Sequence, residues 1–85
     1  MTQVYILKSI TTGRFYIGCT VHLDRRLAEH NAGKSASTKA YRPWEIVHTE
    51  SFGTLLEARR RERHLKKQKS RAYLERVILG DELSG

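Results

Sequence analysis

Cysteine and long apolar runs are nearly absent from this sequence, and each absence excludes a class of protein. The 85 residues include one cysteine, Cys19, so neither an intramolecular disulfide nor a cysteine-based zinc site can form. No apolar run approaches the length of a membrane span or of a signal-peptide core. We therefore expect a cytoplasmic protein with no membrane partner and a single domain, because the chain is too short for two domains.

Acidic residues are also scarce, and this shortage indicates the kind of partner. Asp and Glu number 9 against 16 Lys and Arg, which gives a net charge of +7 and a pI near 10. So strong a positive charge on a small domain is typical of proteins that bind nucleic acid. Simple solubility is the alternative explanation.

The apolar pattern predicts three short strands. Residues 4–7 form a compact apolar run rich in β-formers, and residues 14–17 follow after a turn at Gly13. Together they predict a hairpin over residues 3–18, in which Tyr5 and Tyr16 can share a face. A third strand is predicted over residues 44–49.

Alternation along the third strand predicts which side chains lie together. Trp44, Ile46 and His48 are expected on one face, and Glu45, Val47 and Thr49 on the other. Trp44 is expected to anchor the core rather than to stack on a base.

Three helices are expected, at residues 22–31, 55–68 and 70–79. Gly33 ends the first, Thr54 caps the second with Glu57 three residues on, and Ser70 caps the third. The order β-β-α-β-α-α predicts an α+β domain, a three-stranded antiparallel sheet flanked by helices. The single domain takes in residues 1–85, with a core of about residues 2–78 and a loose tail at 81–85.

Polar residues occupy several positions where such a fold needs apolar ones. Tyr16 ends a strand, and Arg26 and His30 lie on the apolar stripe of the first helix. Glu62 falls within the stripe of the second helix, which otherwise contains Leu55, Ala58 and Leu65. A buried carboxylate requires a cation, and either Arg26 or a metal ion could serve.

Each of these groups suits phosphodiester cleavage. A divalent metal ion on Glu62 would neutralise charge on the phosphate, and the planar fork of Arg26 would bind its non-bridging oxygens. Tyr16 or His30 would take the proton from the attacking water. An ordinary phenol has a pKa of about 10, so a tyrosine base would need neighbouring cations to lower it.

Basic residues in two segments are candidates for contacts with nucleic acid. The polar loop 33–40 is either a flexible connector or a phosphate-binding loop. Residues 59–71 hold a dense run of Lys and Arg that suits backbone phosphates, although a solvated helix face is the alternative. The candidates are Lys34, Lys39, Arg59, Arg63, Lys66, Lys67, Lys69 and Arg71.

The spacing of the motifs resembles that of the GIY-YIG endonuclease superfamily over about residues 2–78. The similarity is closest to small stand-alone members related to the N-terminal nuclease domain of the excision-repair incision subunit. The first motif tripeptide, Val4-Tyr5-Ile6, matches the family's Gly-Ile-Tyr only loosely, whereas the second, Tyr16-Ile17-Gly18, matches Tyr-Ile-Gly at every position. The matching motifs are Val4-Tyr5-Ile6, Tyr16-Ile17-Gly18, Leu23-x-x-Arg26-x-x-x-His30 and Glu57-Ala58-x-x-x-Glu62-x-x-Leu65-Lys66.

This resemblance implies an enzyme that acts on DNA with one divalent metal ion, Mg²⁺ or Mn²⁺, and RNA is not excluded as a substrate. Tyr5 and Tyr16 would be the motif tyrosines, with Tyr16 the expected base, and Gly18 would let the backbone approach a phosphate. Arg26 and His30 would be catalytic, and Glu62 would hold the metal ion.

The sequence departs from the family pattern at two positions. Cys19 stands where several members have lysine, and Leu74 stands where several have asparagine. Both departures bear on the rate of cleavage and on the choice of substrate.

Three hypotheses follow. The first is a metal-dependent DNA endonuclease, structure-directed or non-specific, with a setting in DNA repair or recombination. The second is a non-enzymatic nucleic-acid-binding module with the same fold. The third is a structural protein in which Arg26 and Glu62 form a buried ion pair and Tyr16 is part of the core.

Overall fold

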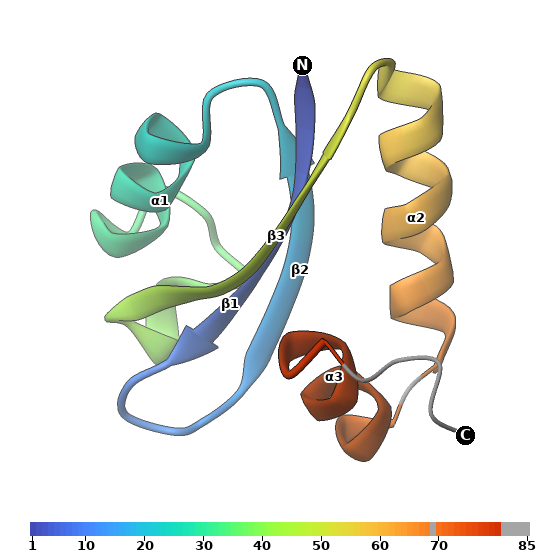
Figure 1. The fold of residues 1–85 in the computed structure, drawn as a ribbon. Helices are drawn as coiled ribbons and strands as arrows, with labels where there is room; N and C mark the ends of the chain where they lie inside the picture. Colours follow the sequence, from blue (N-terminus) through green and yellow to red (C-terminus); the bar gives the residue numbers. More distant parts are fainter. Residues whose placement is uncertain (69, 81–85) are drawn as a thin grey trace.

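A three-stranded antiparallel sheet forms the centre of the computed structural model, which describes residues 1–68 and 70–80 (Figure 1). Its strands are β1 (Thr2–Ser9), β2 (Phe15–Thr20) and β3 (Trp44–Phe52), and they are arranged in the order β2-β1-β3. The first strand of the chain is therefore the middle strand of the sheet. Lys69 and the tail at 81–85, both named in the sequence predictions, lie outside the described residues.

Helices cover both faces of the sheet. α1 (Leu23–Asn31) lies on one face, and α2 (Leu55–Gln68) and α3 (Arg71–Ile78) lie on the other (Figure 1). The element order confirms the predicted β-β-α-β-α-α arrangement, and a short 3-10 turn (Lys39–Tyr41) precedes β3. No helix within the described residues is long and apolar enough to cross a membrane.

Alternation along β1 divides the interior into two cores. Val4 and Ile6 are buried on the α2 and α3 face with Ala58, Leu65 and Val77. On the α1 face, Tyr5 and Leu7 are buried with Trp44, and Leu23 and Leu27 of α1 pack against them. Since residues of β1 point alternately to opposite faces, one strand supplies both cores.

A bulge in β3 changes which of its side chains share a face. Ile6 pairs with His48, but the next residue, Leu7, pairs with Ile46, so β3 has an extra residue at this point. His48 therefore lies beside Ile6 on the α2 face, whereas Ile46 lies on the α1 face. The predicted common face of Trp44, Ile46 and His48 is wrong for His48, because a bulge breaks the strict alternation.

The buried stripe of α2 is shorter than its sequence pattern predicts. Ala58 and Leu65 are buried, but Leu55 is half exposed. Leu55 lies in the first turn of the helix, soon after the chain leaves the end of β3, so little of the sheet is there to cover it. The predicted cap is present, since Thr54 Oγ1 accepts a hydrogen bond from the backbone N–H of Glu57 at 3.2 Å.

Candidate active site at the edge of β2

Two tyrosines and a histidine lie together between the sheet and α1. Tyr5 pairs with Gly18 and Leu7 pairs with Tyr16, so both tyrosines lie on the α1 face, as predicted. Their ring centroids are 6.4 Å apart, and the His30 ring lies 4.8 Å from that of Tyr16. The two motif tyrosines thus meet under α1.

Gly18 makes room for the hydroxyl of Tyr5. A Cβ atom added at position 18 would lie 2.5 Å from Tyr5 Oη and 2.7 Å from its Cζ, closer than real side chains approach one another. The absence of a side chain therefore lets the phenol reach across the edge strand. The predicted approach of the Gly18 backbone to a phosphate stays a prediction.

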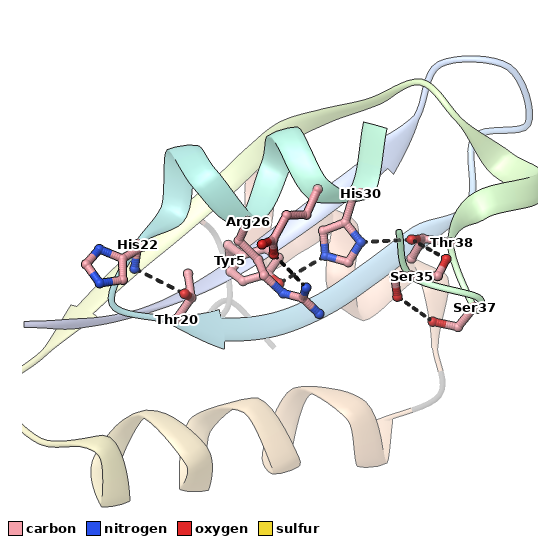
Figure 2. A network of polar contacts seen from close by, with 9 residues as sticks. Tyr5, Thr20, His22, Arg26, His30, Ser35, Ser37 and Thr38 are labelled. Carbon is pink, nitrogen blue, oxygen red and sulfur yellow. Dashed lines mark hydrogen bonds and ion pairs between the residues drawn. The ribbon is translucent and has the colours of Figure 1, made fainter. Parts of the chain in front are cut away.

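His30 is fully buried and bonded at both ring nitrogens (Figure 2). Its Nε2 lies 3.3 Å from Tyr5 Oη, and its Nδ1 lies 2.8 Å from Thr38 Oγ1. Burial, assisted by the charge of Arg26, lowers the pKa of His30. A neutral imidazole without access to solvent is better placed to orient Tyr5 than to take a proton from water.

The phenol of Tyr5 is held in its protonated form. Burial is the main cause that raises the pKa of Tyr5 to about 12, and neighbouring Tyr16 contributes. Arg26 acts in the opposite direction but does not outweigh them. Tyr5 is therefore a hydrogen-bonding group at neutral pH rather than a base.

Arg26 projects from α1 at the border of this cluster, with about a third of its side chain exposed. Its Nη1 donates to Glu29 Oε1 at 3.1 Å, and this bond is the main cause that raises the pKa of Arg26 (Figure 2). A guanidinium has five N–H donors, so a single ion pair leaves donors for an anion.

Glu62 lies on the other side of β2 from Arg26, and the two do not pair. Lys66 Nζ lies 2.8 Å from Glu62 Oε2, and the thiol of Cys19 donates to Glu62 Oε1 at 3.3 Å. The Glu62 side chain is 20% exposed, so it lies at the edge of the fold rather than inside it. The hypothesis of a buried Arg26–Glu62 pair is therefore wrong, and in this structure Lys66 pairs with the carboxylate.

Cys19 takes a different role from the lysine that several family members have there. Burial, together with the bond to Glu62, raises the pKa of the Cys19 thiol, so it remains a neutral donor. It points to the α2 face, because its partner on β1 is Val4.

The two sides of the site meet around edge strand β2. Tyr5 reaches across Gly18 of this strand, and Cys19, the next residue of the strand, bonds Glu62. α1 supplies the arginine from one face, and α2 supplies the carboxylate from the other. Tyr5, Tyr16 and Arg26 therefore lie on the α1 side of the edge strand and Glu62 on its α2 side, and their joint role stays a prediction.

Glu62 suits a divalent metal ion that keeps most of its water. Within residues 1–68 and 70–80, no group of three or more His, Cys, Asp or Glu side chains is placed to hold a metal ion. Mg²⁺ commonly takes one or two carboxylates and completes its shell with water and substrate phosphate. One partly exposed carboxylate fits that pattern, and Lys66 holds the same group in this structure.

The predicted phosphate-binding residues fall into separate places. Four of them surround Glu62 in a hollow of about 340 Å³ on α2, namely Arg59, Arg63, Lys66 and Lys67. Arg71 is used within the fold instead, since it donates to Gly13 O at 2.8 Å and stacks on the Phe15 ring. Lys34 and Lys39 are exposed beyond the end of α1 and do not line this hollow.

Two contacts of the site were not predicted from the sequence. Thr38 is a small polar residue in a loop, and nothing in its neighbourhood indicates that its side chain is buried against His30. Cys19 is recognisable as a departure from the family motif, but its bond to Glu62 depends on how β2 packs on α2.

Fold and site together define a nuclease-type domain. Residues 1–75 match the model of the GIY-YIG catalytic domain, and the chain belongs to this family. The resemblance seen in the motifs is therefore confirmed.

Relatives of this chain are UPF0213 proteins. One from Halobacterium salinarum is 45% identical over 79 residues, which are 92% of this chain and 100% of the relative. Another from Natronomonas pharaonis is 42% identical over 76 residues, 88% of this chain and 87% of the relative. The solution NMR structure of a UPF0213 protein from Bacillus halodurans has a TM-score of 0.59 at 33% identity, covering 98% of this chain and 88% of that one.

Proposed function

We propose that this protein is a divalent-metal-dependent DNA endonuclease that hydrolyses phosphodiester bonds, with a substrate chosen by structure rather than by sequence. Its setting would be DNA repair or recombination. The observation that carries the proposal is a geometric one: the Tyr5 phenol packs near Tyr16, bonds His30 and reaches Gly18, and the next residue of β2, Cys19, bonds Glu62. Membership of the GIY-YIG family gives this cluster a nuclease context.

Arg26 and the basic residues of α2 divide the binding of DNA between them. The planar guanidinium of Arg26 binds the non-bridging oxygens of the phosphate that is cut. Arg59, Arg63 and Lys67 bind flanking phosphates without reading bases, as expected for a surface of exposed cations. The combination favours backbone recognition over sequence recognition.

Tyr16 takes the proton from the attacking water in this proposal. It is only partly buried, whereas Tyr5 is 1% exposed and has a pKa of about 12. Tyr5 orients the reacting groups, and His30 holds Tyr5 in place through the bond to its hydroxyl.

Glu62 is the ligand for Mg²⁺ or Mn²⁺. A bound ion would supply positive charge to the phosphate and leaving oxygens. The Cys19 thiol donates to one oxygen of the carboxylate, and Lys66, which pairs with the other, would have to release that oxygen to an ion.

A cleavage assay tests this function. Purified protein is incubated with linear, nicked, flapped and branched DNA, and with matched RNA, in Mg²⁺ or Mn²⁺. We expect cleavage of at least one DNA substrate, and Glu62→Gln should reduce it by about 100-fold or more while DNA binding persists.

The matched control is Glu45→Gln, since Glu45 is an exposed carboxylate on β3, away from the site. It should cleave at the wild-type rate. Equal cleavage by Glu62→Gln and wild type would show that the activity belongs to another site or to a contaminant.

A non-enzymatic nucleic-acid-binding module is the second candidate. It is favoured by the Lys66–Glu62 ion pair, which already neutralises the carboxylate proposed to hold the metal ion. This reading predicts no cleavage in either metal ion and DNA affinity that is unchanged by Glu62→Gln.

A further inference from the structure

Thr38 is a buried hydroxyl next to the catalytic cluster, although it comes from the loop that follows α1. It is fully buried, and its Oγ1 lies 2.8 Å from His30 Nδ1 (Figure 2). Its backbone oxygen accepts a hydrogen bond from Trp44 Nε1 at 3.0 Å, which ties this part of the loop to the α1 core. The side chain of Thr38 is therefore held by its contact with His30 and its backbone by the bond from Trp44.

A second neighbour of the Thr38 hydroxyl agrees with a hydrogen on His30 Nδ1, and the bond between His30 and Tyr5 is the stronger indication. Thr38 Oγ1 donates to the backbone oxygen of Ser35 at 3.4 Å, and a carbonyl oxygen can only accept. A threonine hydroxyl has one hydrogen, so this bond leaves its lone pairs for His30. The hydrogen between Thr38 and His30 is then carried by Nδ1.

The contact at Nε2, on the other side of the imidazole ring, indicates the same Nδ1–H tautomer. With its hydrogen on Nδ1, neutral His30 has a free lone pair on Nε2, and the hydroxyl of Tyr5 lies 3.3 Å away. Arg26 acts on the Tyr5 oxygen only as a donor, so the hydroxyl hydrogen of Tyr5 needs an acceptor. Among the described residues, the acceptor within hydrogen-bond distance of the Tyr5 hydroxyl is His30 Nε2.

We propose that Thr38 is a positioning residue that fixes His30 in the Nδ1–H tautomer and thereby directs the hydroxyl hydrogen of Tyr5 into the fold. The Tyr5 oxygen then presents only lone pairs to the site. It accepts hydrogen bonds from Arg26 or from the attacking water, and it does not donate to a phosphate oxygen. The tautomer stands on the hydrogen bonds alone, whereas its effect on cleavage rests on the function proposed above.

Nitrogen-15 NMR of the histidine side chains tests the tautomer directly. In wild type and in Thr38→Ser, which keeps the hydroxyl, we expect the His30 hydrogen on Nδ1. In Thr38→Val, which keeps the shape but loses the acceptor, the population should shift towards the Nε2–H form. A wild-type His30 with its hydrogen on Nε2 overturns the proposal, as does an unchanged tautomer in Thr38→Val.

Cleavage kinetics test the positioning role. Thr38→Val should lower kcat by about 10–100-fold with KM nearly unchanged, the scale for partners that orient a functional histidine. Thr38→Ser should restore most of the rate, and Thr11→Val, at an exposed threonine in the turn between β1 and β2, should match wild type. A Thr38→Val enzyme with altered tautomer but wild-type kcat overturns the positioning role.

Two further outcomes are separable. If wild type cleaves no substrate, the proposed function fails, while the NMR result still decides the tautomer. If Thr38→Val does not fold, as a melting curve would reveal, the wild-type and Thr38→Ser spectra decide the tautomer. If Thr38→Ser keeps the wild-type kcat while the wild-type His30 carries its hydrogen on Nε2, the proposal is overturned.

Discussion

Gly18 shows how much the site depends on one missing side chain. Its backbone does not have the positive φ that would by itself require glycine, so the space above it is the reason for glycine here. That space holds the end of the Tyr5 phenol, whose hydroxyl bonds His30 of α1.

Gly18→Ala is expected to destabilise the protein by about 1–3 kcal/mol, the usual cost of overpacking. The added Cβ would lie 2.5 Å from Tyr5 Oη, so the ring must move and its bond to His30 is strained. Urea unfolding measures the loss. Gly53→Ala is the control, because a Cβ there meets only Glu57 Oε1 at 3.8 Å.

Removing the Tyr5 hydroxyl gives a second comparison. In the Tyr5→Phe background the closest atom is gone, so Gly18→Ala should cost less than it does in wild type. Because Cζ remains at 2.7 Å, part of the cost should persist, and a larger cost in the Tyr5→Phe background than in wild type would contradict the steric explanation.

Among the secondary-structure elements, β3 contains a bulge that determines how α2 is attached to the sheet. It places His48 and Glu50 on the α2 face, where Arg61 bonds both carboxylate oxygens of Glu50 at 2.8 and 3.0 Å. His48 Nε2 lies 2.7 Å from Glu50 Oε2. This network attaches α2 to β3 on the side away from the β2 edge, so it supports the helix that carries Glu62.

Glu50→Gln should lower the free energy of unfolding by about 1–3 kcal/mol at neutral pH, the scale for hydrogen bonds to a charged group. Burial alone would raise the pKa of Glu50, but the bonds from Arg61 and His48 outweigh it, and the pKa is lowered from its ordinary 4.5. Unfolding measurements at several pH values would test this effect.

The sign of the pH dependence follows from the lowered pKa. The stabilisation is complete above the unfolded-state pKa of Glu50 and is lost as pH falls through the lower folded-state value. The difference between wild type and Glu50→Gln should therefore shrink in acid. A difference that stays constant down to low pH would exclude the carboxylate charge as its source. Glu45→Gln is again the matched control.

Hydrophobic periodicity predicted most of the elements because each strand and helix buries one face or stripe. Periodicity could not predict the bulge, since one extra residue in β3 becomes visible only when its register against β1 is known. It also misplaced Leu55, because a helix can begin before it reaches the sheet that would cover it.

The site was predicted as a set of residues but not as a geometry. Tyr16, Arg26 and Glu62 were singled out by their polar character in apolar positions, but the fold places Tyr16 beside Tyr5 on the α1 face and Glu62 against Cys19 on the α2 face. The partners of the charges were not predictable, because Arg26 could reach Glu29 or Glu62 until the helices were placed on opposite faces.

At the scale of the whole molecule, the net charge is +7, and four of the basic residues that contribute to it surround Glu62 on α2. Replacing Arg59 and Arg63 together with Gln should weaken DNA binding and reduce the slope of log K against log salt by about 1–2 for one or two lost phosphate contacts. Fluorescence anisotropy at several salt concentrations measures both quantities.

Arg25→Gln is the control for this prediction, since Arg25 is exposed on α1 and does not line the hollow on α2. It should lower the slope less than the double change does. An unchanged slope in the α2 variant would mean that DNA does not lie along this helix.

The position of β1 in the middle of the sheet also affects how the chain is made. β1 is synthesised first and can pair early with β2, but its other edge waits for β3, whose last residue, Phe52, pairs with Thr2. Pairings between residues far apart in sequence slow folding, because a long loop must close before they form. Of the three strands of the sheet, the one that bears Tyr5 therefore precedes both of its partners in the sequence and is paired on both edges only after β3 has been made.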